Sequence, residues 1–490
     1  MTTPSQLFIN GEFVDALAGA TLPVIDPHDG TQIAEIAEGR AEDINRAVTA
    51  ARKAAPEWAA ISAADRGRLL LRLADGLEAR GDELALLETR DTGHPLRDTT
   101  TLDVPRTAAT YRYFGGLADK HQGSVIPVER GFLNYVQRRP VGVAGSIVPW
   151  NFPLMFTSWK LGPALAAGNT TVMKPSELTP LSTLLLAEII AEVGFPPGVV
   201  NIVPGYGSTA GQRLSEHDDV NKISFTGSTT IGRGIVHASA GNLKRVMLEL
   251  GGKGANIVFG DADVDAAVQG AAFAIFHNQG QACIAGSRLL LHDSIADEFT
   301  EKFLELTASL RVGDPKDTAT EVGPLTSRVH KERVLDWIDI AQSEGGEVLC
   351  GGSVPPGLPP DGCYVLPTVV KATSGTRVTN EEVFGPFVNV GSFSSDEDAV
   401  AQANSTEYGL GAGLWTNDLT RAHRVSEQIR AGMVWVNCYK RVNPGSPFGG
   451  VGASGYGREM GFEAMHEYTE AHSTWISTEP LTPWYRRETG

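Results

Sequence analysis

Cysteine is scarce in this chain, with four residues among 490. Cys283, Cys350, Cys363 and Cys438 are widely spread, and no pair has the short spacing typical of zinc ligands. The pattern therefore indicates neither a disulfide framework nor a metal site, and it favours a reducing, cytoplasmic location. Cys350, Cys363 and Cys438 are expected to be structural thiols.

Positive charge is also in deficit, because 41 lysines and arginines face 58 aspartates and glutamates, for a net charge of -17. Nucleic acids and anionic membranes both select basic surfaces, so we expect neither as a partner. Long apolar runs are missing as well, since the most apolar helix-like stretch, 181–193, is interrupted by Glu188 and Glu192. Residues 1–11 carry no basic segment followed by an apolar one, so we expect no membrane span and no targeting signal.

The chain is longer than the roughly 250–300 residues that one core usually serves, so two or three domains are expected. Apolar residues recur at helical spacing over 42–60 and 69–87, which predicts a helical amino-terminal part. Short apolar runs then alternate with helical stretches. We predict strands over 141–148, 170–173, 199–203, 222–225 and 256–259, and helices over 181–193 and 264–276.

This alternation continues to about residue 450 and is typical of doubly wound α/β domains, whose parallel strands bind dinucleotides at their carboxyl ends. The common fingerprint G-x-G-x-x-G is nevertheless absent, because Gly211 comes one residue late after Gly207. A cofactor would therefore need another phosphate-binding turn. Segment 227–232, directly after a predicted strand, supplies Ser228 and a helix amino terminus that suit a pyrophosphate.

Cys283 stands among small residues in the sequence GQACIAG, a setting that lets a substrate and a backbone amide approach the sulfur closely. Taken alone, such a thiol is more often a packing residue than a nucleophile. Further motifs are PWNFP at 149–153, KPSE at 174–177, FTGS at 225–228, MLELGGK at 247–253, EEVFGP at 381–386 and SPFGG at 446–450. With these motifs in this order, the chain resembles the aldehyde dehydrogenase superfamily over nearly its whole length, in its NAD(P)-dependent, non-acylating form.

The resemblance implies two doubly wound α/β domains and a small β unit for oligomerisation. It places the NAD-binding domain at 1–121 and 141–251, the catalytic domain at 252–453, and the bridging unit at 122–140 and 470–490. The bridging unit would add an edge strand to a partner's sheet, so a homodimer or homotetramer is expected.

The chemistry expected of Cys283 is attack on an aldehyde, which gives a thiohemiacetal and, after hydride loss to the cofactor, an acyl-thioester. Asn151 and the backbone N–H of Cys283 are expected to stabilise the oxyanion. The resemblance assigns to Glu249 the role of the base that activates water for hydrolysis to a carboxylic acid. It also points to Lys160 and Glu459 as a proton path, although a buried ion pair is the commoner reason for such charges.

Ten residues are expected to bind the cofactor by the same resemblance: Pro149, Trp150, Lys174, Glu177, Gly207, Gly227, Ser228, Leu250, Glu382 and Phe384. In the family, the residues that match Lys174 and Glu177 bind the adenosine ribose. A carboxylate there accepts hydrogen bonds from hydroxyls and repels a 2′-phosphate, so NAD is favoured and NADP use is left open. Thr230 and Gly452 stand where the family often has an acid and a lysine, so roles tied to those side chains do not transfer.

A mainly apolar tunnel is expected around the aldehyde, lined by Phe152, Met155, Trp159, Val442 and Phe448. Ordinary core packing is the alternative for each of them. Three cations are expected at the tunnel entrance, namely Arg106, Lys440 and Arg441. They would favour an aldehyde that also carries a carboxylate, a semialdehyde. The alternative is that they are solvated or pair with Asp103 and Glu129.

Two other functions fit the same resemblance. A coenzyme-A-acylating dehydrogenase is disfavoured by Glu249, which argues for hydrolysis. A non-catalytic structural or binding protein on the same fold is disfavoured by the joint presence of Cys283, Glu249 and Asn151.

Overall fold

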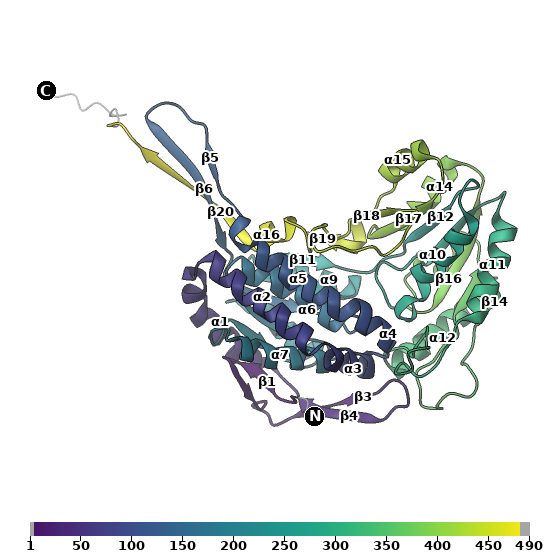
Figure 1. Ribbon diagram of the computed structural model, residues 1–490, viewed down its shortest axis with the longest axis horizontal. Coiled ribbons are helices and arrows are strands. Elements are labelled where there is room, and N and C mark those ends of the chain that lie inside the picture. The colour runs from purple at the N-terminus through teal and green to yellow at the C-terminus, as the bar shows by residue number, and fades with distance from the viewer. Residues whose placement is uncertain (1–3, 481–490) are drawn as a thin grey trace.

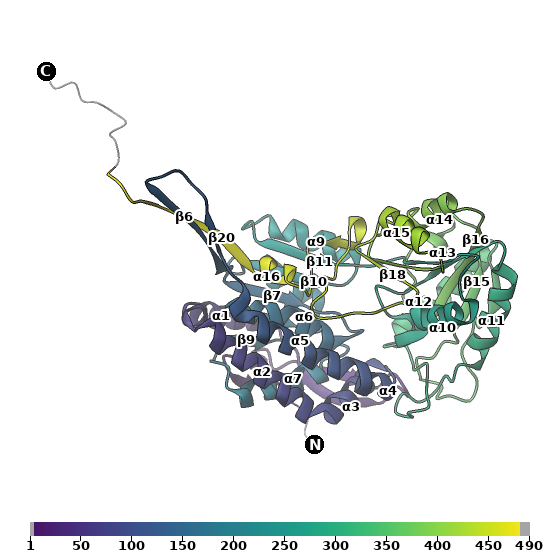
Figure 2. The same ribbon diagram turned by 45° about the horizontal axis from the view of Figure 1, so that its top comes forward.

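The computed structural model describes residues 4–480, in which the chain forms two α/β bodies and a projecting arm (Figures 1 and 2). Each body is built on one large sheet, of eight strands in the first and seven in the second. The arm is a three-stranded antiparallel sheet. The predicted α/β class is confirmed.

The first sheet has the order β19-β11-β10-β7-β8-β9-β1-β2, and its strands from β11 to β9 run parallel. β7, β8 and β10 are buried at every residue, as strands covered on both faces should be. The strands are β1 (Leu7–Ile9), β2 (Glu12–Val14), β7 (Val143–Ile147), β8 (Thr170–Lys174), β9 (Val200–Ile202), β10 (Lys222–Thr226), β11 (Arg245–Glu249) and β19 (Gly455–Tyr456).

Helices cover both faces of this sheet. Ile44 of α1 shares a core with Val143 of β7, whereas Leu184 of α7 shares a second core with Ala144, which points the opposite way. The α-helices are α1 (Ala41–Ala60), α2 (Ala63–Ala79), α3 (Gly81–Thr92), α4 (Leu96–Asp98), α5 (Val104–Leu117), α6 (Pro153–Ala166), α7 (Leu181–Val193), α8 (Gln212–Glu216), α9 (Thr229–Ser239) and α16 (Glu463–Glu467). Shorter turns are η1 (Thr99–Asp103), η2 (Ala118–Lys120), η3 (Gly207–Gly211) and η5 (Gly452–Ser454).

The helices predicted over 42–60 and 69–87 are confirmed by α1 and by α2 with α3, but the amino-terminal part also contains strands and a helix break. The described residues before α1 are not helical, because they form β1, β2 and the hairpin of β3 (Thr21–Ile25) with β4 (Gln32–Ala37). The stretch 69–87 is not one helix, since α2 ends and α3 begins at Arg80. The residue after Arg80 is a glycine, which has a low helix propensity. Arg80 itself forms ion pairs with Glu83 and Glu188.

The second sheet has the order β14-β15-β16-β13-β12-β17-β18 and is parallel except for β14. Its strands are β12 (Ala255–Val258), β13 (Arg288–His292), β14 (Glu347–Cys350), β15 (Thr368–Lys371), β16 (Phe387–Phe393), β17 (Gly411–Trp415) and β18 (Met433–Val436). Its helices are α10 (Val264–Phe276), η4 (His277–Gly280), α11 (Ala296–Ser309), α12 (Arg328–Ser343), α13 (Arg377–Asn380), α14 (Asp396–Ala403) and α15 (Leu419–Gln428). Helices α7 and α10 have the predicted bounds. No helix within residues 4–480 is both long and apolar enough to cross a membrane.

The arm joins segments that are far apart in the sequence. β20 (Thr469–Ser477) pairs along its length with β6 (Phe132–Pro140), which also pairs with β5 (Ser124–Ile126). Both views show the arm extending away from the two bodies (Figures 1 and 2). Large exposed apolar side chains on it are Val125, Ile126, Phe132, Leu133, Trp475 and Ile476. Residues 481–490 of the predicted bridging unit lie outside the described residues.

Candidate active site

Three pockets run from the first sheet to the second, and each shares lining residues with the next. The outer pocket, of about 640 Å³, lies beside Lys174 at the carboxyl end of β8. The central pocket, of about 430 Å³, shares Trp150 and Ser228 with it and also contains Glu249 and Cys283. The inner pocket is lined by Cys283 from the other side. Cys283 is therefore where the central and inner pockets meet.

The turn that precedes Cys283 has an uncommon backbone. Residues 278–280 all have φ between 54° and 71°, the left-handed region that non-glycine residues rarely adopt. A Cβ on its glycine would overlap a backbone carbonyl of the second body. The amide of Gln279 donates to the carbonyl oxygens of Gly93 and Pro324, at 2.6 and 2.8 Å. These hydrogen bonds hold the turn, and with it the position of Cys283.

Asn151 lies between β7 and α6 and is 4% exposed. Its side-chain amide donates to the carbonyl of Gln281 at 2.8 Å, and the amide of Asn278 donates to the carbonyl of Asn151 at 2.8 Å. The turn before Cys283 therefore also fixes Asn151. A carboxamide has two N–H groups, so the second one is available to an oxygen in the central pocket.

Glu249 ends β11 and is 1% exposed, and neither of its carboxylate oxygens has a hydrogen-bond partner in the described range, 4–480. Burial and the charge of Glu459 raise the pKa of Glu249 well above its usual value, which favours the protonated form. Lys160 donates to Glu459 and to the hydroxyls of Ser224 and Thr226, the latter two at 3.0 and 2.8 Å. Lys160 and Glu459 are both fully buried and form the ion pair considered above; neither lines a pocket described here.

Acids rather than bases surround the Cys283 thiol. Burial raises the pKa of this thiol, and the charges of Glu382 and Glu249 raise it further. Lys440 is close enough to interact with a thiolate, but burial lowers the pKa of Lys440 to about 7. The protein alone therefore favours the neutral thiol, and a positive charge brought into the central pocket would favour the thiolate.

The ten residues expected to bind a cofactor all line the outer or central pocket: Pro149, Trp150, Lys174, Glu177, Gly207, Gly227, Ser228, Leu250, Glu382 and Phe384. In the outer pocket, Lys174 donates to Glu177 at 3.0 Å, and the hydroxyl of Ser228 caps the amino terminus of α9. In the central pocket, Glu382 accepts from the backbone N–H of Gly252 at 2.8 Å. Carboxylates, an ammonium and a helix amino terminus are the groups that suit the ribose hydroxyls and pyrophosphate of a dinucleotide.

The inner pocket contains all but one of the expected substrate residues, namely Arg106, Phe152, Met155, Trp159, Lys440, Val442 and Phe448. Arg441 is the exception. Its side chain is exposed, and its backbone carbonyl accepts from the indole of Trp435 at 2.9 Å. The chain has a left-handed backbone at Lys440, with φ of 53°, and Lys440 is buried while Arg441 faces outward. Arg441 is exposed and its charge acts on Arg106, so its place at the tunnel entrance stays a prediction.

Two histidines near Cys283 were not indicated by the sequence. His330 donates from Nε2 to the carbonyl of Phe384 at 2.7 Å and stacks near Trp150, with ring centroids 5.0 Å apart. It thereby supports Phe384, whose φ of 61° is unusual for an aromatic residue. His277 lines the inner pocket and is 8% exposed. His277 precedes Cys283 by only six positions and could have been noticed, whereas His330 reaches the site only through the fold.

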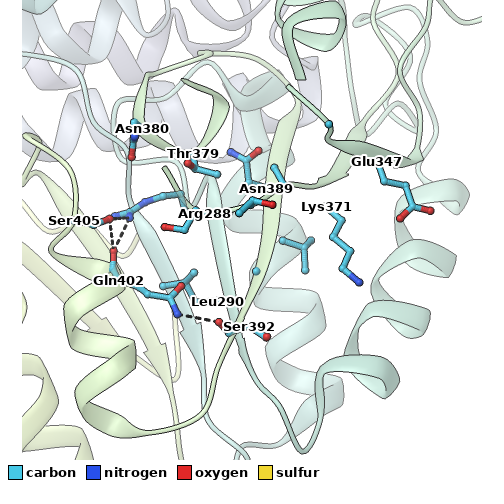
Figure 3. A pocket seen from close by; sticks show the side chains of 16 residues that line it. Arg288, Leu290, Glu347, Lys371, Thr379, Asn380, Asn389, Ser392, Gln402 and Ser405 are labelled. Atoms are coloured by element: carbon cyan, nitrogen blue, oxygen red, sulfur yellow. Dashed lines mark hydrogen bonds between the residues drawn. The ribbon is translucent and has the colours of Figure 1, made fainter. Parts of the chain in front are cut away.

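A further pocket of about 470 Å³ lies on the second sheet (Figure 3). Cys283 is not among its lining residues, and neither is any histidine. The Arg288 guanidinium within it donates to the carbonyl oxygens of Lys253, Gln402 and Ala403. This pocket therefore offers neither a thiol nor an imidazole, and its buried cation is already bonded to the backbone.

Comparison with known proteins identifies the family to which this site belongs. The sequence profile of the Aldehyde dehydrogenase family matches residues 13–474. The chain belongs to the aldehyde dehydrogenase family. Within the family, it is 46% identical to human mitochondrial aldehyde dehydrogenase over 478 residues, which is 96% of this chain and 92% of that protein.

Solved structures of aldehyde dehydrogenases also share its fold. PnpE from Pseudomonas sp. WBC-3 is 65% identical with a TM-score of 0.97, and the match covers 99% of this chain and 100% of that chain. PnpE has also been solved with nicotinamide adenine dinucleotide. The NAD+ complex of an aldehyde dehydrogenase from Bacillus cereus is 42% identical with a TM-score of 0.95, covering 97% of this chain and 96% of that chain. The predicted aldehyde dehydrogenase-like fold is thus confirmed.

Proposed function

We propose that this family member oxidises an aldehyde to a carboxylic acid with NAD as the hydride acceptor. The observation that carries the proposal is the position of Cys283 between the inner pocket and the central pocket. A carbonyl in the inner pocket and a nicotinamide in the central pocket would meet at its sulfur. The NAD complexes of two relatives support this cofactor.

In the first half-reaction, the Cys283 thiolate attacks the aldehyde carbon. A C–S bond forms, and the electron pair of the carbonyl moves to oxygen, which gives a thiohemiacetal oxyanion. The free side-chain N–H of Asn151 and the backbone N–H of Cys283 donate to that oxygen. NAD, when bound, supplies the acceptor for the hydride of this carbon, and the carbon remains on Cys283 as an acyl-thioester.

In the second half-reaction, Glu249 removes a proton from water while the water oxygen attacks the acyl carbon. The C–S bond then breaks, which restores the thiolate and releases the carboxylic acid. Because burial favours the protonated form of Glu249, this residue must lose a proton before each hydrolysis. The ion pair of Lys160 and Glu459 is our proposed path for that proton.

NAD rather than NADP is the proposed cofactor because of the charge in the outer pocket. Glu177 is held by Lys174 beside the helix amino terminus of α9. Its carboxylate can accept from both ribose hydroxyls, and it would repel a 2′-phosphate. Because Glu249 would activate water, the acyl-thioester would be hydrolysed, whereas in the coenzyme-A-acylating alternative it would be transferred to coenzyme A.

An absorbance assay for NADH with a panel of aldehydes tests the function. We expect NADH with NAD, a kcat/KM with NADP at least about tenfold lower, and no acceleration by coenzyme A. Asn151→Ala should lower kcat by about 10²–10³, as loss of one oxyanion donor does. Absence of NADH with every aldehyde, or a higher kcat/KM with NADP, would contradict the proposal.

We further propose that the substrate carries a carboxylate away from its aldehyde group. Arg106 and Lys440 line the inner pocket beside mainly apolar residues, with His277 and Cys283. Their acidic neighbours are engaged elsewhere, because Asp98 pairs with Arg97 and Asp103 bonds to His94. The only hydrogen bonds of the Lys440 ammonium within residues 4–480 are long ones to backbone carbonyls, at 3.5 Å. Cations without an acidic partner in such a pocket favour an anionic ligand.

Charge selectivity can be measured by comparing a semialdehyde with an uncharged aldehyde of equal length. Wild type should show the higher kcat/KM for the semialdehyde. Arg106→Ala should lower that value by about 10–100-fold, as loss of a charge-assisted hydrogen bond does, and change the uncharged substrate little. Arg424→Ala is the control, because this arginine is exposed on α15 and lines none of the three pockets, and it should keep the preference. Equal rates for both substrates, or a preference that survives Arg106→Ala, would refute a carboxylate-reading pocket.

We propose a homodimer or homotetramer assembled through the arm. The exposed apolar side chains on β5, β6 and β20 would gain stability if a second copy covered them. In this scheme, 1–121 and 141–251 form the cofactor domain, 252–453 the catalytic domain, and 122–140 with 470–490 the bridging unit. All four cysteines are free thiols, which suits the cytoplasmic location that we also propose.

Sedimentation velocity of an arm variant tests this assembly. The double substitution Trp475→Ser and Ile476→Ser should shift the protein toward monomer, since both side chains are large, apolar and exposed on β20. Leu419→Ser, which changes an exposed leucine at the start of α15, is the control and should sediment like wild type. A wild-type monomer, or an unchanged oligomer in the double variant, would overturn the assignment.

A further inference from the structure

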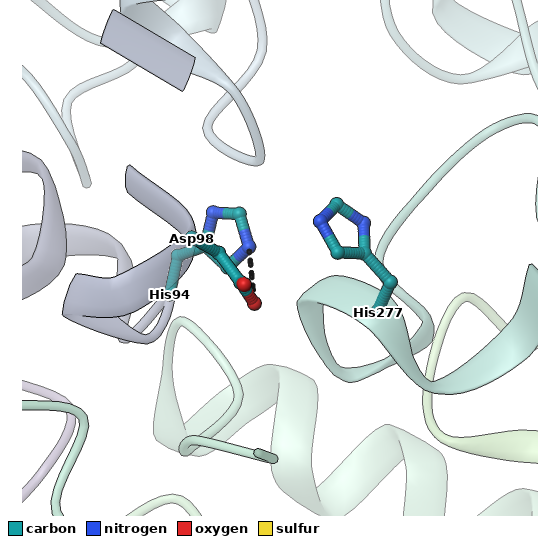
Figure 4. Close-up of side chains that lie close together, drawn as sticks. All are labelled: His94, Asp98 and His277. Atoms are coloured by element: carbon teal, nitrogen blue, oxygen red, sulfur yellow. Dashed lines mark ion pairs between the residues drawn. The ribbon is translucent and has the colours of Figure 1, made fainter. Parts of the chain in front are cut away.

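Three possible metal ligands lie close together, and one of them, His277, lines the inner pocket. His94 and Asp98 come from the segment around α4, and His277 follows α10 of the second body (Figure 4). One ligand atom from each residue lies within 4.8 Å of the other two. His94 and His277 are 1% and 8% exposed, so water has little access to either ring.

Three of the four imidazole nitrogens in this cluster lack a hydrogen-bond partner within the described residues. Nε2 of His94 and both ring nitrogens of His277 are buried without a partner within residues 4–480. Leaving a buried polar atom unpaired costs stability, so such atoms usually mark a missing ligand or water. Figure 4 shows His277 opposite His94, with Asp98 beside His94. The two rings are nearly perpendicular, with centroids 5.1 Å apart.

The arrangement of His94 matches that of a zinc-binding histidine. Its Nδ1 is bonded to Oδ2 of Asp103 at 2.7 Å, which directs Nε2 into the cluster. Nε2 lies 3.7 Å from Oδ2 of Asp98, whose other oxygen pairs with Arg97 at 3.3 Å. Metal–ligand bonds of about 2.0–2.2 Å in a tetrahedron place ligand atoms roughly 3.3–3.6 Å apart. Asp98 and His94 are therefore nearly in place, and only His277 must approach.

Carboxylates and cations both lie near the cluster. Asp98 and Asp103 supply two carboxylates, and Arg97, Arg106 and Lys440 supply three cations. Net charge therefore does not select a cation here; the unpaired imidazole nitrogens and the position of Asp98 do.

We propose that His94, Asp98 and His277 bind one divalent transition-metal ion of the zinc class. Two imidazoles and one carboxylate are a donor set that such ions prefer, and the inner pocket leaves the fourth position to water. The ion would stand at the wall of the pocket that leads to Cys283 and would hinder entry of the aldehyde. Metal binding is independent of the proposed dehydrogenase function, whereas the inhibition rests on it.

Cobalt(II) absorption spectroscopy of the full chain tests the site. We would use Cys283→Ser as the background, so that no thiolate at this position competes for the ion. Titration should give one equivalent of bound Co²⁺ with the intense visible bands of a four-coordinate site. His277→Phe and Asp98→Asn should each abolish stoichiometric binding, and Asp103→Asn should weaken it by about 10–100-fold, as loss of a supporting carboxylate does.

The matched control is His121→Phe. His121 and His466 form another close pair of rings, with nitrogens 3.5 Å apart, and could bind an ion by themselves. His121→Phe should bind Co²⁺ like its background. Absence of binding, or binding that survives both His277→Phe and Asp98→Asn, or binding lost in His121→Phe, would overturn the proposed site.

An inhibition assay tests whether the bound ion blocks the inner pocket, which the Co²⁺ titration does not address. In wild type, Zn²⁺ should inhibit competitively with the aldehyde, a chelator should reverse the inhibition, and His277→Phe should be resistant to it. Inhibition that persists in His277→Phe would overturn the blocking role and point to the thiol of Cys283. If no aldehyde is oxidised, the proposed function fails, while the Co²⁺ titration still decides the metal site.

Discussion

Residues 278–280 form a turn with a left-handed backbone at the site, and the positions of the reacting groups depend on that turn. Each non-glycine residue in this conformation costs on the order of 1–3 kcal/mol, so the surroundings must hold it. Gln279 provides that support through hydrogen bonds to Gly93 and Pro324. Because Asn151 exchanges hydrogen bonds with the same turn, the oxyanion donor and Cys283 are positioned together. A shift of the turn would move both at once.

The electrostatics of the site follow from its burial. Glu249 and Glu382 are acids in a region of low dielectric, and burial raises the pKa of each, that of Glu382 to about 7. The same burial raises the pKa of the Cys283 thiol. Burial thus favours the neutral forms of Glu249 and of the Cys283 thiol, whereas Glu382 is partly ionised near neutral pH. Reactivity then depends on the charge and the exclusion of water that ligands bring.

Much of this site could be predicted from the sequence because its parts are local motifs. Pro149, Glu249 and Cys283 each stand in a short motif at a strand end or turn, and the fold brings such ends together. Helices α7 and α10 could be predicted because their apolar pattern is continuous and their ends are marked. The break at Arg80 could not, since ion pairs across the fold contribute to it.

Contacts between the two bodies were the least predictable feature. His94 and His277 lie close together although nearly two hundred residues separate them in the sequence, and neither residue stands in a motif. The outward direction of Arg441 depends on the left-handed backbone at Lys440, which residue type alone does not determine. Specificity features of the inner pocket therefore required the structure, whereas the reaction class did not.

We propose that the oxidised substrate is held on Cys283 until Glu249 activates water. This order of steps can be tested by mixing Glu249→Gln with NAD and an accepted aldehyde, quenching in acid, and mapping peptides by mass spectrometry. We expect a burst of NADH close to one per active site, followed by slow turnover, with the acyl mass on the peptide that contains Cys283. A burst without an acyl group on that peptide, an acyl group elsewhere, or the absence of any burst would contradict it.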